Sequence, residues 1–92
     1  MITAFLLVHC QPKRITAVAE ELANTDGVAE VYTTTGSADC IAIVRVADLE
    51  ALATVVTERI ASFEGINRTD THLAIRSWSA SDEHAAFDIG ID

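Results

Sequence analysis

The sequence predicts one α+β domain, a four-stranded antiparallel sheet with two helices on one of its faces. Two observations lead to this prediction. The hydrophobic periodicity follows the order strand, helix, strand, strand, helix, strand over residues 2–78. Right-handed crossovers then place the first and third strands at the centre of the sheet, and these two strands are apolar on both faces. A length of 92 residues fits a single domain.

The first half of the chain predicts a strand, a helix and a second strand. Residues 2–8 carry apolar side chains on both faces: Ile2, Ala4, Leu6 and Val8 on one, Phe5 and Leu7 on the other. Pro12 fits the first turn of a helix, and Gly27 fits its left-handed end. Between them, apolar residues recur at helical spacing; they are Ile15, Val18, Ala19, Leu22 and Ala23. Residues 28–35 are rich in β-branched side chains, which favours a second strand.

The second half repeats this order after a turn at Gly36. Residues 39–46 predict a strand that is apolar on both faces. Asp48 is the expected N-cap of the next helix, and Gly65 ends that helix. The apolar stripe of the helix is Leu49, Leu52, Val56, Ile60 and Phe63. Residues 67–78 alternate as a long last strand.

The folded domain is therefore predicted to span residues 1–78, and residues 79–92 form a C-terminal tail. The tail pattern fits a short docked helix. Its cap, its two docking side chains and its end would be Ser81, Phe87, Ile89 and Gly90.

One face of the sheet is left without helices, and it is apolar. Such a face would leave about six aliphatic side chains in water. At roughly 1.5–3 kcal/mol each this forfeits about 10 kcal/mol, which rivals the stability of a typical domain. A second copy covering this face is the simplest remedy, so we expect a homo-oligomer. We assign Ala42 to this open face.

The charge balance argues against nucleic acid and membranes as partners. The net charge is −8, and the six basic residues are dispersed. No apolar run reaches the ~20 residues of a membrane span, and residues 1–5 lack a signal-peptide pattern. Cys10 and Cys40 form no metal or redox motif, which favours buried thiols in a reducing cytoplasm over a disulfide.

The polar residues form no convincing catalytic set. His9 lies beside Cys10, His72 lies between Asp70 and Arg76, and His84 follows Asp82 and Glu83. Packing or a solvated surface explains each group better than a thiol–imidazole pair, a charged network or a metal site. We therefore expect no enzymatic activity, no metal and no cofactor.

The best polar candidate combines two short motifs, Gly36-x-x-Asp39 and Thr69-x-Thr71. An aspartate at the mouth of an apolar sheet pairs with a cation such as the ammonium group of an amino acid. Threonine hydroxyls and nearby backbone N–H groups bind its carboxylate. Ordinary turn chemistry is the alternative explanation of the glycine and the aspartate.

Three runs of sequence carry a family resemblance: Thr35-Gly36-Ser37-Ala38-Asp39-Cys40-Ile41-Ala42, Asp48-Leu49-Glu50-Ala51-Leu52 and Glu64-Gly65-Ile66-Asn67-Arg68-Thr69-Asp70-Thr71-His72-Leu73-Ala74. In this order they resemble the effector-binding domain of the Lrp/AsnC feast-or-famine regulators. The match covers roughly residues 2–78. Two departures stand out. The 92 residues contain no helix-turn-helix, and Ser37 and Ala38 stand where the family often has an acidic and an aromatic residue.

The resemblance implies a ferredoxin-like sandwich that dimerises sheet to sheet, often within octameric rings. It implies that amino acids or related effectors bind between dimers, with Gly36, Asp39, Thr69 and Thr71 at the matching positions. It further implies a stand-alone effector-binding module that modulates transcription regulation or amino-acid metabolism, in mixed assemblies with full-length regulators and without direct DNA binding.

Two other functions remain open. Dimeric ferredoxin-like domains also include cofactor-independent monooxygenases, for which His9, His72 and Trp78 would matter more than Asp39. That function requires a roomy pocket inside each monomer, whereas a sensor has its pockets between dimers. The third possibility is a structural assembly partner that binds no ligand.

Overall fold

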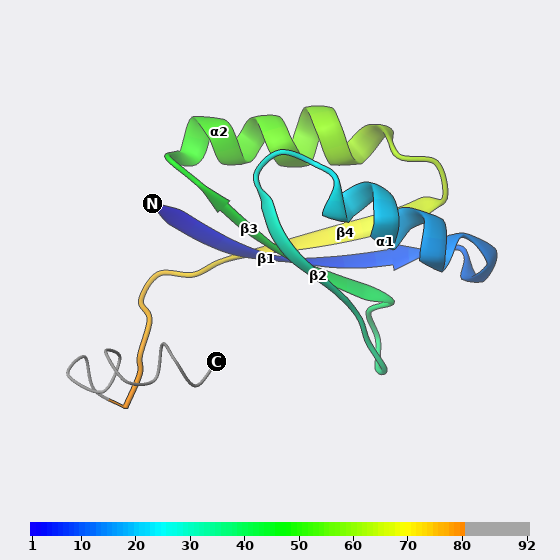
Figure 1. Cartoon of the computed structure of the whole chain (residues 1–92), viewed down its shortest axis with the longest axis horizontal. Helices are drawn as coiled ribbons and strands as arrows, with labels where there is room; N and C mark the ends of the chain where they lie inside the picture. The colour runs from blue at the N-terminus through cyan, green and yellow to red at the C-terminus, as the bar shows by residue number, and fades with distance from the viewer. Residues whose placement is uncertain (81–92) are drawn as a thin grey trace.

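The computed structural model describes residues 1–80, and it confirms the predicted fold class. Four antiparallel strands lie in the order β2-β3-β1-β4, and the helices lie on one face of the sheet (Figure 1). The strands are β1 (Ile2–Cys10), β2 (Val28–Thr33), β3 (Cys40–Val46) and β4 (Ile66–Leu73). The helices are α1 (Ile15–Ala23) and α2 (Leu49–Ala53). As predicted, the two strands that are apolar on both faces are the central pair.

The core lies between the sheet and the helices. Its largest fully buried side chains come from both layers: Leu6, Val8, Cys40 and Val44 from the sheet, and Val18, Leu22, Val55 and Ile60 from the helices. Ala42 belongs to the same core and is 0% exposed. Its assignment to the open face was therefore wrong. Ala42 pairs with Leu6 in the register of β1 and β3, and both side chains point towards the helices.

The second helix begins where the sequence placed it and then changes its winding. Ala51 donates its backbone N–H to Asp48 Oδ1 at 2.8 Å, which confirms the predicted N-cap. After α2 the backbone continues as the π-helical η2 (Thr54–Arg59) and the 3₁₀ turn η3 (Ile60–Ser62). A second 3₁₀ turn, η1 (Pro12–Arg14), precedes α1. Leu49, expected in the apolar stripe, is exposed.

The predicted cap at Gly27 was wrong in its position, because α1 ends at Ala23 and Asn24 is its C-cap. Gly27 does adopt a left-handed φ of +96°, but it lies in the turn before β2 that the hydrogen bond from Val28 N to Thr25 O closes at 3.0 Å. A side chain there would also lack space, because a Cβ would lie 2.8 Å from Val55 Cγ2. Gly27 therefore lets the loop after α1 pass close to the second helix. No helix within residues 1–80 is long and apolar enough to cross a membrane.

The last strand is shorter than predicted. It ends at Leu73 instead of Trp78, and the last backbone hydrogen bond to β1 runs from Ala74 N to Thr3 O at 2.9 Å. In this register Ile75 would lie opposite Ile2, the first residue of β1, so residues beyond 75 have no strand beside them. Residues 74–80 leave the sheet and run away from the body of the domain (Figure 1). The predicted tail helix with Ser81, Phe87, Ile89 and Gly90, and the group at His84, lie outside the described residues.

Candidate functional site

The β2–β3 hairpin brings Gly36 and Asp39 to one end of the sheet. Gly36 adopts φ +102°, and no atom lies within 4 Å of the position a Cβ would take, so the turn needs glycine for its backbone angle and not for space. Thr34 closes the turn from the other side. Its N–H donates to Asp39 O and its hydroxyl donates to Ala38 O, each at 3.1 Å. The turn therefore holds Asp39 at a fixed place.

The Asp39 side chain is hydrogen-bonded to the end of β1. Its Oδ2 accepts the backbone N–H of Cys10 at 2.9 Å, and its own N–H donates to Val8 O at 2.9 Å. The carboxylate is half-buried. Asp39 thus stabilises the last residues of β1, a structural contribution that sequence reasoning missed because it depends on a contact between distant segments. Within residues 1–80 its Oδ1 accepts no hydrogen bond.

The two threonines lie on the other side of β1. Thr69 pairs with Val8 and Thr71 with Leu6, so both hydroxyl-bearing side chains are on the helix-facing side of the edge strand β4. Thr71 is exposed and Thr69 is half-buried. Two inter-strand spacings of about 4.8 Å place the backbones of Asp39 and Thr69 about 10 Å apart. Within a single chain the four candidate residues therefore form two separate groups, Gly36 with Asp39 and Thr69 with Thr71.

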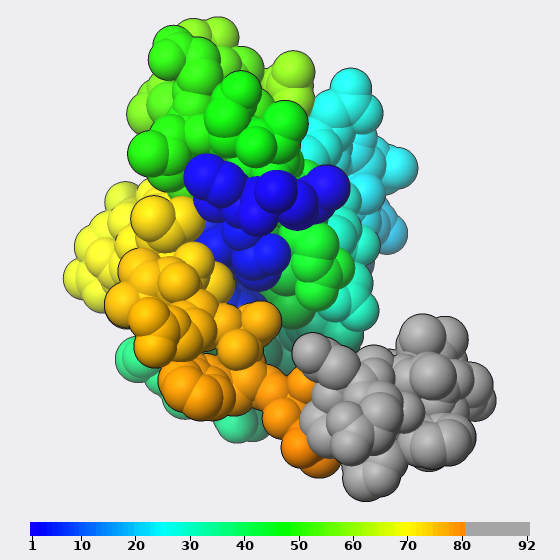
Figure 2. All heavy atoms as spheres, turned by 90° about the vertical axis from the view of Figure 1, so that its left-hand side faces the viewer, coloured from blue at the N-terminus to red at the C-terminus, as the bar shows by residue number. Residues whose placement is uncertain are grey.

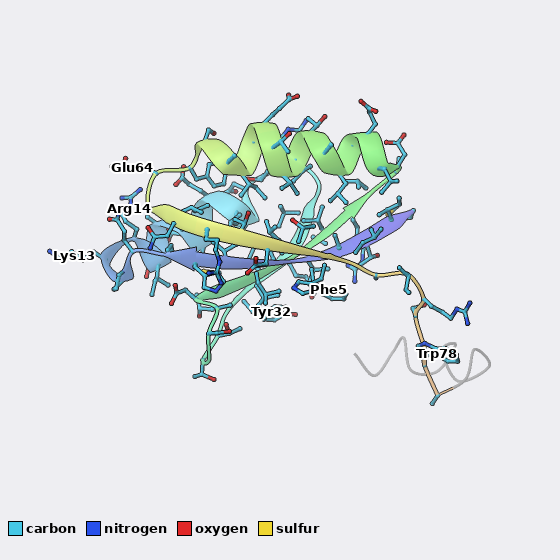
Figure 3. The ribbon with its side chains drawn as sticks, turned by 180° about the vertical axis from the view of Figure 1, so that it is seen from behind. Phe5, Lys13, Arg14, Tyr32, Glu64 and Trp78 are labelled. Atoms are coloured by element: carbon cyan, nitrogen blue, oxygen red, sulfur yellow. The ribbon has the colours of Figure 1, made fainter. Side chains whose placement is uncertain are left out.

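The open face of the sheet carries an apolar surface from three strands. We define it by Phe5, Leu7, Tyr32, Ile41 and Ile43. Phe5 is 40% and Tyr32 is 51% exposed, and both lie on the side away from the helices (Figure 3). The Tyr32 hydroxyl donates to Glu30 Oε2 at 2.9 Å, and this contact with a carboxylate raises the pKa of Tyr32. The predicted uncovered apolar face is present.

A polar group that the sequence did not reveal lies at one end of the open face. Arg68 Nη2 lies 3.3 Å from His9 Nε2 and 3.4 Å from Asp70 Oδ2. His9 Nδ1 lies 4.0 Å from Asp70 Oδ2 and, although buried, makes no hydrogen bond within the described residues. The group depends on the pairing of His9 with Arg68 next to a bulge in the β1–β4 ladder. Such a pairing leaves no local signal in the sequence.

The cysteines are free buried thiols, as expected. Burial raises the pKa of Cys40 to about 11 and also raises that of Cys10. Thiols held in the protonated form are poor nucleophiles. Cys10 faces the core, whereas His9 faces the open side of the sheet, so the two side chains form no thiol–imidazole pair.

The residues considered for an enzyme are not gathered. His72 pairs with Phe5, four positions along β1 from His9, which corresponds to a separation of about 13 Å. Trp78 lies beyond the end of β4 and is 82% exposed. Within residues 1–80, no group of three or more histidine, cysteine or acidic side chains is placed to hold a metal ion.

Comparison with known proteins identifies the family. Residues 3–83 match the model of the Lrp/AsnC ligand binding domain. The chain belongs to this family. The predicted resemblance is thereby confirmed, and the Lrp/AsnC fold agrees with the ferredoxin-like arrangement of the described residues.

Several relatives resemble this Lrp/AsnC domain. An HTH-type transcriptional regulator of Pyrococcus horikoshii, PH0140, is 33% identical over 79 residues, covering 84% of this chain and 50% of the regulator. The crystal structure of TTHA0845 from Thermus thermophilus has 47% identity and a TM-score of 0.82, covering 86% of this chain and 99% of that one. AsnC of E. coli shares the fold, with a TM-score of 0.80 at 22% identity over 87% of this chain and 54% of AsnC. The chain spans about half the length of the curated relatives it matches.

Proposed function

We propose that this chain is a stand-alone effector-binding module of the Lrp/AsnC type, and that it binds an amino acid or a related small metabolite. The observation that carries the proposal is the match of residues 3–83 to the family's ligand binding domain. The structure of NMB0573 from Neisseria meningitidis, which has the same fold at 17% identity, is a complex with L-Met, and this supports the choice of ligand class.

The charges and hydroxyls of the candidate residues suit a zwitterion. Asp39 offers a carboxylate to an ammonium group, and Thr69 and Thr71 offer hydroxyls to a carboxylate. The separation of about 10 Å between the backbones of Asp39 and Thr69 exceeds the span of one α-amino acid headgroup. We therefore infer that the two groups of one chain belong to different halves of a site, and that a second subunit completes it.

The assembly we propose begins with a dimer formed through the open face. Phe5, Ile43 and their apolar neighbours lose their contact with water there, which offsets the entropy lost on association. Such dimers would join into an octameric ring or a similar even-numbered assembly, and mixed assemblies with full-length regulators would modulate transcription regulation or amino-acid metabolism. The module acts in the cytoplasm as a non-enzyme. With a net charge of −8 it does not bind DNA by itself.

The test is binding of amino acids to the purified chain, first by thermal shift across the twenty amino acids and then by calorimetry. Asp39→Asn is the informative variant. It keeps an oxygen that accepts the Cys10 N–H and removes only the negative charge. Loss of a charge partner in a partly desolvated site costs ~2–5 kcal/mol, so affinity should fall at least thirtyfold.

Asp26→Asn is the matched control, because Asp26 is exposed and Arg59 Nη1 donates to its backbone oxygen, not to its carboxylate. It should bind as the unchanged chain does. Equal affinity of Asp39→Asn and the unchanged chain would place the site elsewhere. If no amino acid raises the melting temperature at millimolar concentration, the assembly-partner function replaces the sensor function.

A further inference from the structure

Residues 74–80, which we call the arm, present large apolar side chains that the rest of residues 1–80 leaves uncovered. Ile75 is 92% exposed and Trp78 is 82% exposed. Within residues 1–80, the one backbone hydrogen bond between the arm and the domain is that from Ala74 to Thr3. Figure 2 shows the arm standing out beside the start of β1 (dark blue). An open hollow lined by Met1, Thr3 and residues 74–77 lies between them. The arm therefore has little packing of its own.

The arm lies on the open-face side of the sheet. Figure 3 shows Trp78 on the same side as Phe5 and Tyr32, away from the helices. The Arg76 guanidinium carbon lies 5.9 Å from the centre of the Trp78 ring, a cation–π distance. A positive charge and an aromatic ring thus stand together next to the face that needs a partner.

We propose that the arm packs on a second copy of this chain, at the β2 edge of that copy's open face. The inference rests on the face-to-face dimer proposed above. In the order β2-β3-β1-β4, the arm extends from one edge strand, and β2 is the other edge. The proposal places the two-fold axis of the dimer along the strands, which puts the β2 of one copy over the β4 of the other.

The chemistry of the β2 edge matches that of the arm. Glu30 and Tyr32 are exposed on its open face, and they are an acidic group and an aromatic group in contact. Arg76 and Trp78 are a basic group and an aromatic group in contact. Docking one pair on the other brings opposite charges and two aromatic rings together, and it covers the exposed Trp78 ring.

Trp78 is the sole tryptophan of the chain, so its fluorescence reports the arm directly. In the intact dimer its emission should be blue-shifted and protected from acrylamide. Both properties should be lost in a monomer made by Ile43→Asp on the open face. A dimer whose tryptophan emits as an indole in water would overturn the arm proposal and leave the dimer standing. Protected emission that persists in the Ile43→Asp monomer would also overturn it.

Charge reversal tests the docking position. Arg76→Glu should raise the dimer dissociation constant about tenfold or more, and Glu30→Arg in the same chain should restore at least part of that loss. Trp78→Ser should weaken the dimer at least as much, whereas Leu49→Ser, at an exposed position on the helix side, should leave it unchanged. No rescue by Glu30→Arg would place the arm on another part of the second copy and contradict the proposal. A chain that sediments as a monomer at all concentrations would instead refute the dimer itself.

Discussion

The two faces of the sheet are built from similar residues and meet different surroundings. Leu6 and Phe5 are neighbours on β1, yet Leu6 is 0% exposed under the helices and Phe5 is 40% exposed on the open side. Ala42 and Ile43 show the same contrast on β3, one buried and the other half-buried. Burial under the helices stabilises the single chain, whereas the exposed apolar area of the open face favours association with a second chain. The same substitution made on one face and then on the other separates the effect on folding from the effect on association.

A charge on the covered face should have the largest effect. In Ala42→Asp the carboxylate would be buried next to Leu6 without a partner. A buried unpaired charge costs about 3–5 kcal/mol, a large part of a small domain's stability. Denaturant unfolding followed by circular dichroism should show this loss, and Ala42→Ser should lose much less. An Ala42→Asp protein with an unchanged unfolding free energy would refute the assignment of Ala42 to the core.

A charge one residue away should act on assembly instead. Ile43→Asp places the carboxylate on the open face, where water reaches it in a single chain. The fold should persist with a circular dichroism spectrum close to that of the unchanged chain. The dissociation constant of the dimer should rise at least about a hundredfold, because the carboxylate would be desolvated in the interface. Ile43→Val is the control that should keep the dimer. A full dimer in Ile43→Asp would mean that the subunits meet through another surface.

The covered face should also show itself in the pH dependence of stability. Burial raises the pKa of Cys40 from 9.0 to about 11, so the folded state keeps the thiol protonated where the unfolded state loses its proton. The thiol leaves stability unchanged well below pH 9, and stability then falls as the pH rises through 9 and 11, by at most about 3 kcal/mol. The raised pKa values of Cys10 and Tyr32 act in the same direction.

The difference between the unchanged chain and Cys40→Ala isolates this contribution. Unfolding free energies at pH 8 and pH 11 should diverge less in the variant than in the unchanged chain. Identical slopes in the two proteins would show that the Cys40 thiol is not held protonated by the fold.

Much of the fold was predictable because the signals are local. The cap at Asp48, the left-handed Gly27 and the helical spacing of Val18 and Leu22 each depend on a few neighbouring residues. The end of β4 was not predictable in this way. The sequence from 74 to 78 continues to alternate as a strand would, but β4 ends at Leu73, and β1 has no residue left to pair with those beyond 75.

The structure was also needed to tell which of the two alternating sets of β3 side chains faces the helices. The side chains on both faces of β3 are apolar, so the pattern alone did not tell whether Ala42 or Ile43 faces the helices. For the candidate site, the sequence identified Gly36 and Asp39 as a turn, and the turn is present. The hydrogen bond from Cys10 to Asp39 and the group of His9, Arg68 and Asp70 depend on long-range register, which a single sequence does not encode locally.

The solution mass of the unchanged chain tests the central claim most directly, namely that the open face is an interface between two copies. Light scattering coupled to gel filtration should give an even multiple of the 9.9 kDa chain mass, and the mass should fall to that of one chain in Ile43→Asp. A stable 9.9 kDa particle at micromolar concentration in the unchanged protein would contradict the claim.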